Sequence, residues 1–117
     1  MHDETSKELR TTLTSAGKLE LSIVTVPMPE PREGEVLVRV EASPINPSDL
    51  GLLLGPADVA SLSITGSGDD TIASMDVPEA MMPAMQARLD AALPVGNEGA
   101  GWVIAAGAGA EHMLSLI

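Results

Sequence analysis

The sequence predicts a mainly β fold of the α+β class, with one or two short helices. Apolar and polar residues alternate over residues 19–26 and 35–42, as they do in half-buried strands, while glycines and prolines interrupt the chain between such segments. The chain has 117 residues, of which 44% are hydrophobic and 20% charged. Because this size and composition are typical of a single globular domain, we expect residues 1–117 to form one domain.

The first two strands are expected to form a hairpin. Residues 8–14 are rich in threonine, residues 19–26 alternate in hydrophobicity, and Gly17 lies in the short turn between them. Residues 1–7 are polar and are expected to be frayed. Three prolines in residues 27–31 then end the hairpin, because proline has no N–H to donate to a strand ladder.

The clearest strand signal covers residues 35–42, in which valines at every second position share one face. Two prolines then fix a loop over residues 43–49. Ser48 or Asp49 is expected to cap a short helical turn through residues 50–54, because both side chains can accept a hydrogen bond from a free backbone N–H.

A flexible loop and a helix are expected over residues 57–93. Residues 57–72 are small and polar, and residues 65–70 within them indicate an exposed flexible loop. The helix has Asp76 as a candidate N-cap, Pro83 near its start, and its clearest part at residues 84–93. Its apolar stripe at helical spacing consists of Met82, Met85, Leu89 and Leu93.

The last part of the chain alternates turns with apolar segments. A glycine-rich turn at residues 95–101 leads into a candidate buried strand at residues 102–106, and a second turn follows at residues 107–110. Residues 113–117 are apolar. Since Trp102 is the only aromatic residue, Leu, Val, Ile, Ala and Met side chains must fill the core.

Seventeen acidic residues oppose six basic ones, which gives a formal net charge of −11. Phosphate backbones and anionic membranes attract clustered Lys and Arg, so we expect neither nucleic acid nor a membrane as a partner. The N-terminus lacks the basic and apolar regions of a signal peptide, and no apolar run approaches the length of a membrane span. A cytoplasmic protein is therefore expected.

No motif of the sequence forms a complete cofactor or metal site by spacing alone. The glycines around Ala100 do not fit G-x-G-x-x-G, because Ile104 or His112 stands where the third glycine would be. Cysteine is absent, and His2 and His112 are the only histidines. No metal site is expected, and His112 has no partner at a spacing typical of a catalytic triad.

Two segments in order resemble the medium-chain dehydrogenase/reductase superfamily, particularly its zinc-independent quinone oxidoreductase branch. They are E-V-L-V-R-V-E-A-S-P-I-N-P-S-D-L at residues 35–50 and P-V-G-N-E-G-A-G at residues 94–101. The preceding hairpin and the P-x-P-x-P-x-x-G segment at residues 27–34 resemble the same family. Residues 57–93 then look like an insertion.

The resemblance implies a catalytic domain with a GroES-like partial β-barrel, which is incomplete here. In that family a Rossmann domain, absent from this chain, follows and binds NADP(H) or NAD(H). Zinc-dependent relatives have a cysteine where Asn46 stands and a histidine where Asn97 stands. The resemblance therefore implies a zinc-independent member, with the cofactor supplying the hydride chemistry.

The same resemblance implies two parts of one cleft. The cofactor-binding loop would consist of Asn46, Pro47, Ser48 and Asp49, and a structural turn would consist of Asn97, Glu98, Gly99 and Gly101. The alternative for Asn46 and Asp49 is a turn supported by their side chains around Pro47, and for Glu98 a structural hydrogen bond beneath its turn. No catalytic residue is assigned.

The expected function is that of the N-terminal part of an NAD(P)H-dependent oxidoreductase that reduces a quinone, enone or carbonyl. Since the family's remaining strands and cofactor domain come after Ile117, the chain alone is expected to be inactive. Its expected partners are the small-molecule substrate and a missing Rossmann chain or further copies of itself. The alternative is a non-enzymatic acidic β-domain that acts as a protein-interaction module. The sequence does not distinguish NADPH from NADH.

Overall fold

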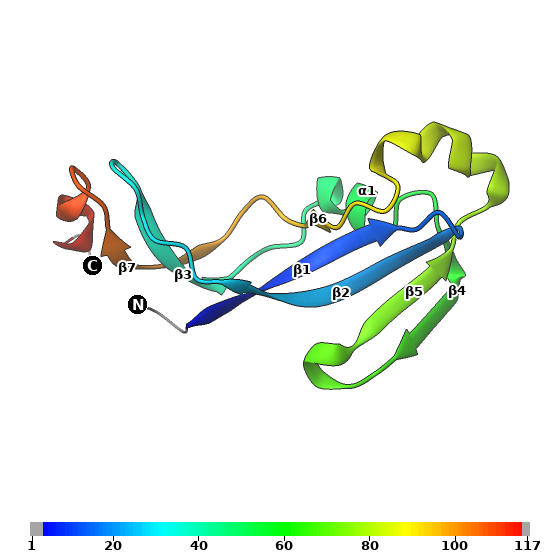
Figure 1. Cartoon of the computed structure of the whole chain (residues 1–117), viewed down its shortest axis with the longest axis horizontal. Helices are drawn as coiled ribbons and strands as arrows, with labels where there is room; N and C mark the ends of the chain where they lie inside the picture. The colour runs from blue at the N-terminus through cyan, green and yellow to red at the C-terminus, as the bar shows by residue number, and fades with distance from the viewer. Residues whose placement is uncertain (1–3, 116–117) are drawn as a thin grey trace. The chain divides into compact units, whose positions relative to one another are not determined.

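Two β-sheets organise the part of the chain described by the computed structural model, residues 4–115 (Figure 1). The elements, in order, are β1 (Thr5–Leu13), β2 (Lys18–Pro27), β3 (Val36–Ala42), η1 (Pro47–Asp49), α1 (Leu50–Leu53), β4 (Asp58–Thr65), η2 (Gly68–Asp70), β5 (Ile72–Asp76), η3 (Glu79–Arg88), β6 (Leu93–Pro94), β7 (Ala100–Ala106) and η4 (Glu111–Ser115), where η denotes a 3-10 helix. The fold is mostly β without a closed barrel, as predicted, and is consistent with part of a GroES-like domain.

The chain divides into two compact units, and neither is continuous in sequence. Within the described residues, unit 1 consists of residues 4–5, 27–44 and 97–115, and unit 2 of residues 6–26 and 45–96. Each unit has its own backbone pairing and is described by itself.

The larger sheet has the strand order β4-β5-β2-β1-β6. β1 and β2 are joined by the predicted turn, in which Gly17 has a φ of +82° and donates its N–H to the Thr14 carbonyl at 3.0 Å. β1 begins at Thr5, so the prediction of a frayed segment is wrong for residues 5–7, while residues 1–3 lie outside the described part. Hydrogen bonding to β2 keeps these polar residues in the sheet.

Unit 2 contains a small core without aromatic rings. Leu13 of β1, Leu19 of β2, and Met75 and Val77 at the end of β5 are buried together. Partly buried apolar side chains pack around them from Leu21, Leu54, Ala57, Met82, Met85 and Leu89. The expectation that aliphatic and methionine side chains replace rings is thus confirmed for this core.

The exposed loop predicted at residues 65–70 lies at the turn between two strands, β4 and β5, and these strands were not predicted. β4 pairs antiparallel with β5, which pairs antiparallel with β2 from Lys18↔Asp76 to Ser22↔Ile72. Figure 1 shows β4 and β5 as a hairpin, with the short 3-10 turn η2 at its tip. β4 is mostly exposed, so backbone hydrogen bonds hold it in place with little side-chain burial, and its composition therefore indicated a loop.

The α-helix predicted over residues 84–93 is also wrong. The segment is the 3-10 helix η3, which contains Pro83, and residues 93–94 form the short strand β6. Proline lacks the N–H of an α-helical ladder and clashes with the preceding turn, which disfavours a regular α-helix here. Asp76 ends β5 instead of capping the helix, and Pro78 occupies the cap position. The predicted stripe nevertheless faces the core through Met82, Met85 and Leu89.

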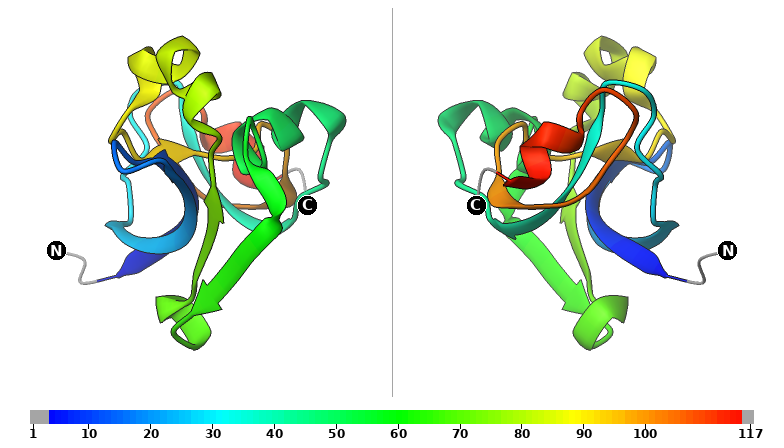
Figure 2. Two further views of the ribbon diagram at one scale, coloured as in Figure 1. Left: turned by 90° about the vertical axis from the view of Figure 1, so that its right-hand side faces the viewer. Right: turned by 90° about the vertical axis from the view of Figure 1, so that its left-hand side faces the viewer.

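Unit 1 is organised by the two-stranded antiparallel sheet of β3 and β7, whose register runs from Val36↔Ala106 to Ala42↔Ala100. A Cβ atom on Gly101 would lie 1.9 Å from the Arg39 carbonyl oxygen, so only glycine allows this approach of the two backbones. After β7, Gly107 donates its N–H to the Glu35 carbonyl at 2.8 Å, which closes the far end of the sheet. In Figure 2 the 3-10 helix η4 is the red coiled ribbon that follows β7.

The strand predicted over residues 102–106 is present as β7, but the prediction that it is buried is wrong. Trp102 is 51% exposed, and Ile104 is exposed as well. A two-stranded sheet buries little apolar surface by itself. None of the helices within residues 4–115 has the length and hydropathy needed to cross a membrane.

We expect Gly101→Ala to destabilise unit 1 by about 1–3 kcal/mol, because the added methyl group would overlap the Arg39 carbonyl. Fluorescence of Trp102, the only tryptophan, reports on unit 1 during urea unfolding. Gly51→Ala is the matched control, because a Cβ there meets no atom within 4 Å. Equal unfolding curves for both variants would contradict the close approach.

Candidate functional site

The predicted cofactor-binding loop forms a compact turn at the start of α1. Asn46 caps η1, and its backbone N–H donates to the Asp49 carboxylate at 2.8 Å, while the Asp49 N–H donates to the Asn46 carbonyl at 2.9 Å. Pro47 occupies the first turn, where a missing N–H has no cost. Asp49 is only 7% exposed, so its carboxylate supports the turn, as the structural alternative for this residue predicts.

The outer surface of this loop is formed by Pro47 and Ser48, which are both exposed, and by Ile45, which is 76% exposed. Asn46 is half-buried and carries its own hydrogen bonds in the capping arrangement. Ser48 is therefore the most accessible polar side chain of the predicted loop.

The second predicted part, the glycine-rich turn, belongs to unit 1. Asn97, Glu98 and Gly99 are exposed, and a Cβ on Gly99 would lie 3.2 Å from a methyl group of Val40. This crowding, together with that at Gly101, gives both glycines a backbone role. The loop of Asn46 and the turn of Asn97 fall in different units, so their shared cleft stays a prediction.

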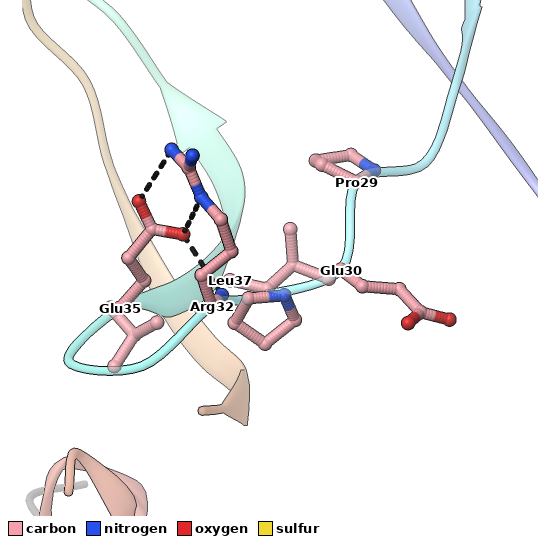
Figure 3. Close-up of a pocket in the computed structure, with 7 residues that line it drawn as sticks. Pro29, Glu30, Arg32, Glu35 and Leu37 are labelled. Carbon is pink, nitrogen blue, oxygen red and sulfur yellow. Dashed lines mark hydrogen bonds and ion pairs between the residues drawn. The ribbon is translucent and has the colours of Figure 1, made fainter. Parts of the chain in front are cut away.

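Sequence analysis missed an ion pair at a hollow of about 570 Å³ in unit 1, which Pro29, Val36 and Leu37 help to line. Figure 3 shows Arg32 and Glu35 facing each other there, and the Arg32 Nε and Nη2 atoms each lie 3.1 Å from a Glu35 carboxylate oxygen. The Arg32 backbone N–H donates to the same carboxylate at 2.9 Å. The R-x-x-E spacing around Gly34 is the signal that would have indicated it.

These hydrogen bonds change the acidity of the Glu35 carboxyl group. The side-chain hydrogen bond from Arg32, and then the backbone hydrogen bond from the same residue, lower the pKa of Glu35 below its ordinary value. Glu35 also raises the pKa of the Arg32 guanidinium. Both groups are exposed, so the pair orders the turn between the proline-rich segment and β3 without forming a buried acid–base site.

Arg88 is a second residue that sequence analysis missed, and it lies in unit 2. Its guanidinium donates from Nη2 to the Thr11 hydroxyl at 3.3 Å, and that hydroxyl donates to the Leu52 carbonyl at 2.8 Å. The Arg88 Nε atom is buried and has no hydrogen-bond partner within residues 4–115. The chain of contacts fastens η3 to β1 and α1, which is a structural role.

Comparisons with known proteins give one local likeness. The chain is 56% identical over 34 residues to a zinc-type alcohol dehydrogenase-like protein of Schizosaccharomyces pombe. The match covers 29% of this chain and only about a tenth (10%) of the length of that protein. No protein-family model matches the sequence. The likeness supports a relationship to the medium-chain dehydrogenase/reductase superfamily, and thereby to an oxidoreductase family.

The residues present do not fit a catalytic zinc ion. Zinc sites in proteins use Cys, His, Asp or Glu side chains, whereas Asn46 and Asn97 stand at the positions that the resemblance assigns to ligands. Within residues 4–115, no three His, Asp or Glu side chains form a group that could hold a metal ion. No step of a proposed reaction is therefore assigned to zinc.

We expect Asp49→Ala to lower the free energy of unfolding of unit 2 by about 1 kcal/mol, because the Asn46 N–H loses its acceptor. Urea unfolding followed by circular dichroism measures the change. Ser48→Ala is the control, since that side chain is exposed and its loss is expected to cost less than about 0.5 kcal/mol. A larger loss in the Ser48 variant would argue against the capping role of Asp49.

Arg32→Gln is expected to raise the pKa of the Glu35 carboxyl group toward its ordinary value. Because Arg32 lowers this pKa in the folded chain, the pair is formed at neutral pH and is lost as the pH falls through the lowered pKa. A pH titration of the Glu35 side-chain carboxyl by ¹³C NMR measures the shift. Arg39→Gln, which removes the partner of Glu41, should leave the Glu35 titration unchanged. An unaltered Glu35 titration in the Arg32 variant would rule out the pair.

Proposed function

We propose that this chain is the N-terminal part of the catalytic domain of a zinc-independent, NAD(P)H-dependent oxidoreductase that reduces quinones, enones or carbonyl compounds by hydride transfer. The observation that supports the oxidoreductase part of this proposal most directly is the 56% identity over 34 residues to a zinc-type alcohol dehydrogenase-like protein. The mostly β fold and the absence of cysteine agree with a zinc-independent member of that superfamily.

In this proposal the chain contributes a substrate and nicotinamide surface, while another domain holds the phosphates of the cofactor. The exposed Ser48 hydroxyl and the Asn46 side chain would position the polar groups of a flat ring beside Pro47 and Ile45. Phosphate groups need clustered cations or a glycine-rich helix start, and with a net charge of −11 this chain offers neither. The nicotinamide would supply the hydride, and the protein would supply orientation.

Asn46 is the residue that best separates this function from a purely structural role of the loop. Asn46→Asp keeps an acceptor oxygen for the cap of η1 but removes the two amide N–H donors and adds a negative charge. The loop should therefore stay folded, while binding of a carboxamide or carbonyl group at this position becomes weaker.

The experiment fuses the 117-residue chain to the remaining catalytic-domain strands and the Rossmann-type cofactor domain of a zinc-independent reductase, and follows NADPH oxidation with a quinone, an enone and an aldehyde in parallel. We expect turnover by the fusion but not by the chain or the cofactor domain alone. Asn46→Asp should lower kcat/KM about tenfold, since a hydrogen bond to substrate or cofactor is lost.

Ser63→Ala, an exposed serine on β4, is the control that should keep full activity. Sustained NADPH oxidation by the isolated chain would refute the assignment of the cofactor phosphates to another domain. Equal turnover by the cofactor domain with and without this chain would refute the proposal as a whole.

A further inference from the structure

Unit 1 has a second hollow, of about 400 Å³, which is more apolar than the hollow beside the ion pair of Arg32 and Glu35. Its walls come from the proline-rich segment before β3, from β3 itself and from the end of β7. The apolar part of the lining consists of Met28, Pro29, Pro31, Leu37, Ile104, Ala105 and Ala106. Ile104 is 41% exposed, so this surface is open to a partner.

The backbone around this hollow is held in place before any partner binds. Met28 donates its N–H to the Glu4 carbonyl at 3.2 Å, which fixes the proline-rich segment beside the start of β1. A Cβ on Gly107 would lie 1.8 Å from the Arg32 carbonyl oxygen, so the end of β7 presses against the same segment. Since prolines also restrict this segment, little conformational entropy is lost when a ligand binds.

The rim of the hollow is acidic. Glu4 and Glu30 both line it, and Figure 3 shows the Glu30 side chain extending away from the ion pair of Arg32 and Glu35. Within its described residues, unit 1 has seven Glu side chains and two Arg side chains, which gives a formal net charge of −5. Both arginines already pair with neighbouring carboxylates, Arg32 with Glu35 and Arg39 with Glu41.

We infer that this hollow is a docking groove for a polypeptide segment that presents apolar side chains between Lys or Arg residues. Apolar side chains of such a segment would cover Leu37 and Ile104, and its cations would lie near Glu4 and Glu30. A second copy of this chain would bring its own excess of negative charge to the groove, and an anionic membrane would do the same. The groove is independent of the proposed reductase activity, because it needs neither cofactor nor substrate.

The test uses the 117-residue chain without cofactor and a synthetic peptide of alternating leucine and lysine. Binding is followed by amide chemical-shift changes of Leu37 and Ile104 in NMR titrations. Two matched peptides carry glutamate in place of lysine, or serine in place of leucine. We expect saturable binding of the leucine–lysine peptide, weaker binding at high salt, and no saturation with either matched peptide.

Variants locate the groove. Ile104→Ala should weaken binding about tenfold through the lost apolar contact, whereas Ile64→Ala, the same change at a 63% exposed position of β4, should leave it unchanged. Glu30→Gln should weaken binding about two- to fivefold, and Glu33→Gln, at an exposed position outside the lining, should have a smaller effect.

Four results would overturn the inference. The first three are equal binding of the lysine and glutamate peptides, chemical-shift changes confined to unit 2, and equal effects of the two isoleucine variants. The fourth is a dimer of the chain alone, seen by light scattering, that dissociates on Ile104→Ala, because it would assign the groove to a second copy. Failure of the peptide test leaves the NADPH assay of the fused chain unaffected, so the two proposals fail separately.

Discussion

Backbone pairing between β3 and β7 is the constraint on which unit 1 depends. The two strands lie far apart in the sequence, and they approach closely because Gly101 and Gly107 have no side chain to meet the carbonyls of Arg39 and Arg32. The glycine-rich turn, the ion-paired turn and the apolar hollow are all built on these two strands or on their ends. A methyl group at either glycine would therefore disturb every one of these features.

The few basic side chains pair with acidic ones at the surface, and the pair of Arg32 with Glu35 orders a turn. Exposed ion pairs join Arg32 to Glu35, Arg39 to Glu41, and Lys7 to Asp69. Each exposed pair adds little stability, but these pairs engage basic side chains, of which the chain has few. The excess of carboxylates leaves a formal net charge of −11.

Local sequence signals predicted the elements that local interactions determine. Gly17 marked the hairpin turn, alternating valines marked β3, and the prolines near Asn46 marked the short turn into α1. β4 was missed because its partner, β5, is supplied by the fold and its own side chains are mostly exposed. η3 was assigned as an α-helix because its stripe fits either helix type, although Pro83 favours the tighter one. For the candidate site, the sequence predicted the loop and the structural alternative for Asp49, but pairs such as Arg32 with Glu35 depend on how a turn closes.

Most residues of unit 2 lie, in sequence, between the second and third segments of unit 1. During synthesis, all strands of the larger sheet are therefore made before β7, whereas the backbone of β3 has no antiparallel partner until β7 follows. Because of this order of translation, unit 2 can begin to pair its strands earlier than unit 1. β3 is also the strand that a chaperone could bind for the longest time before its partner strand is made.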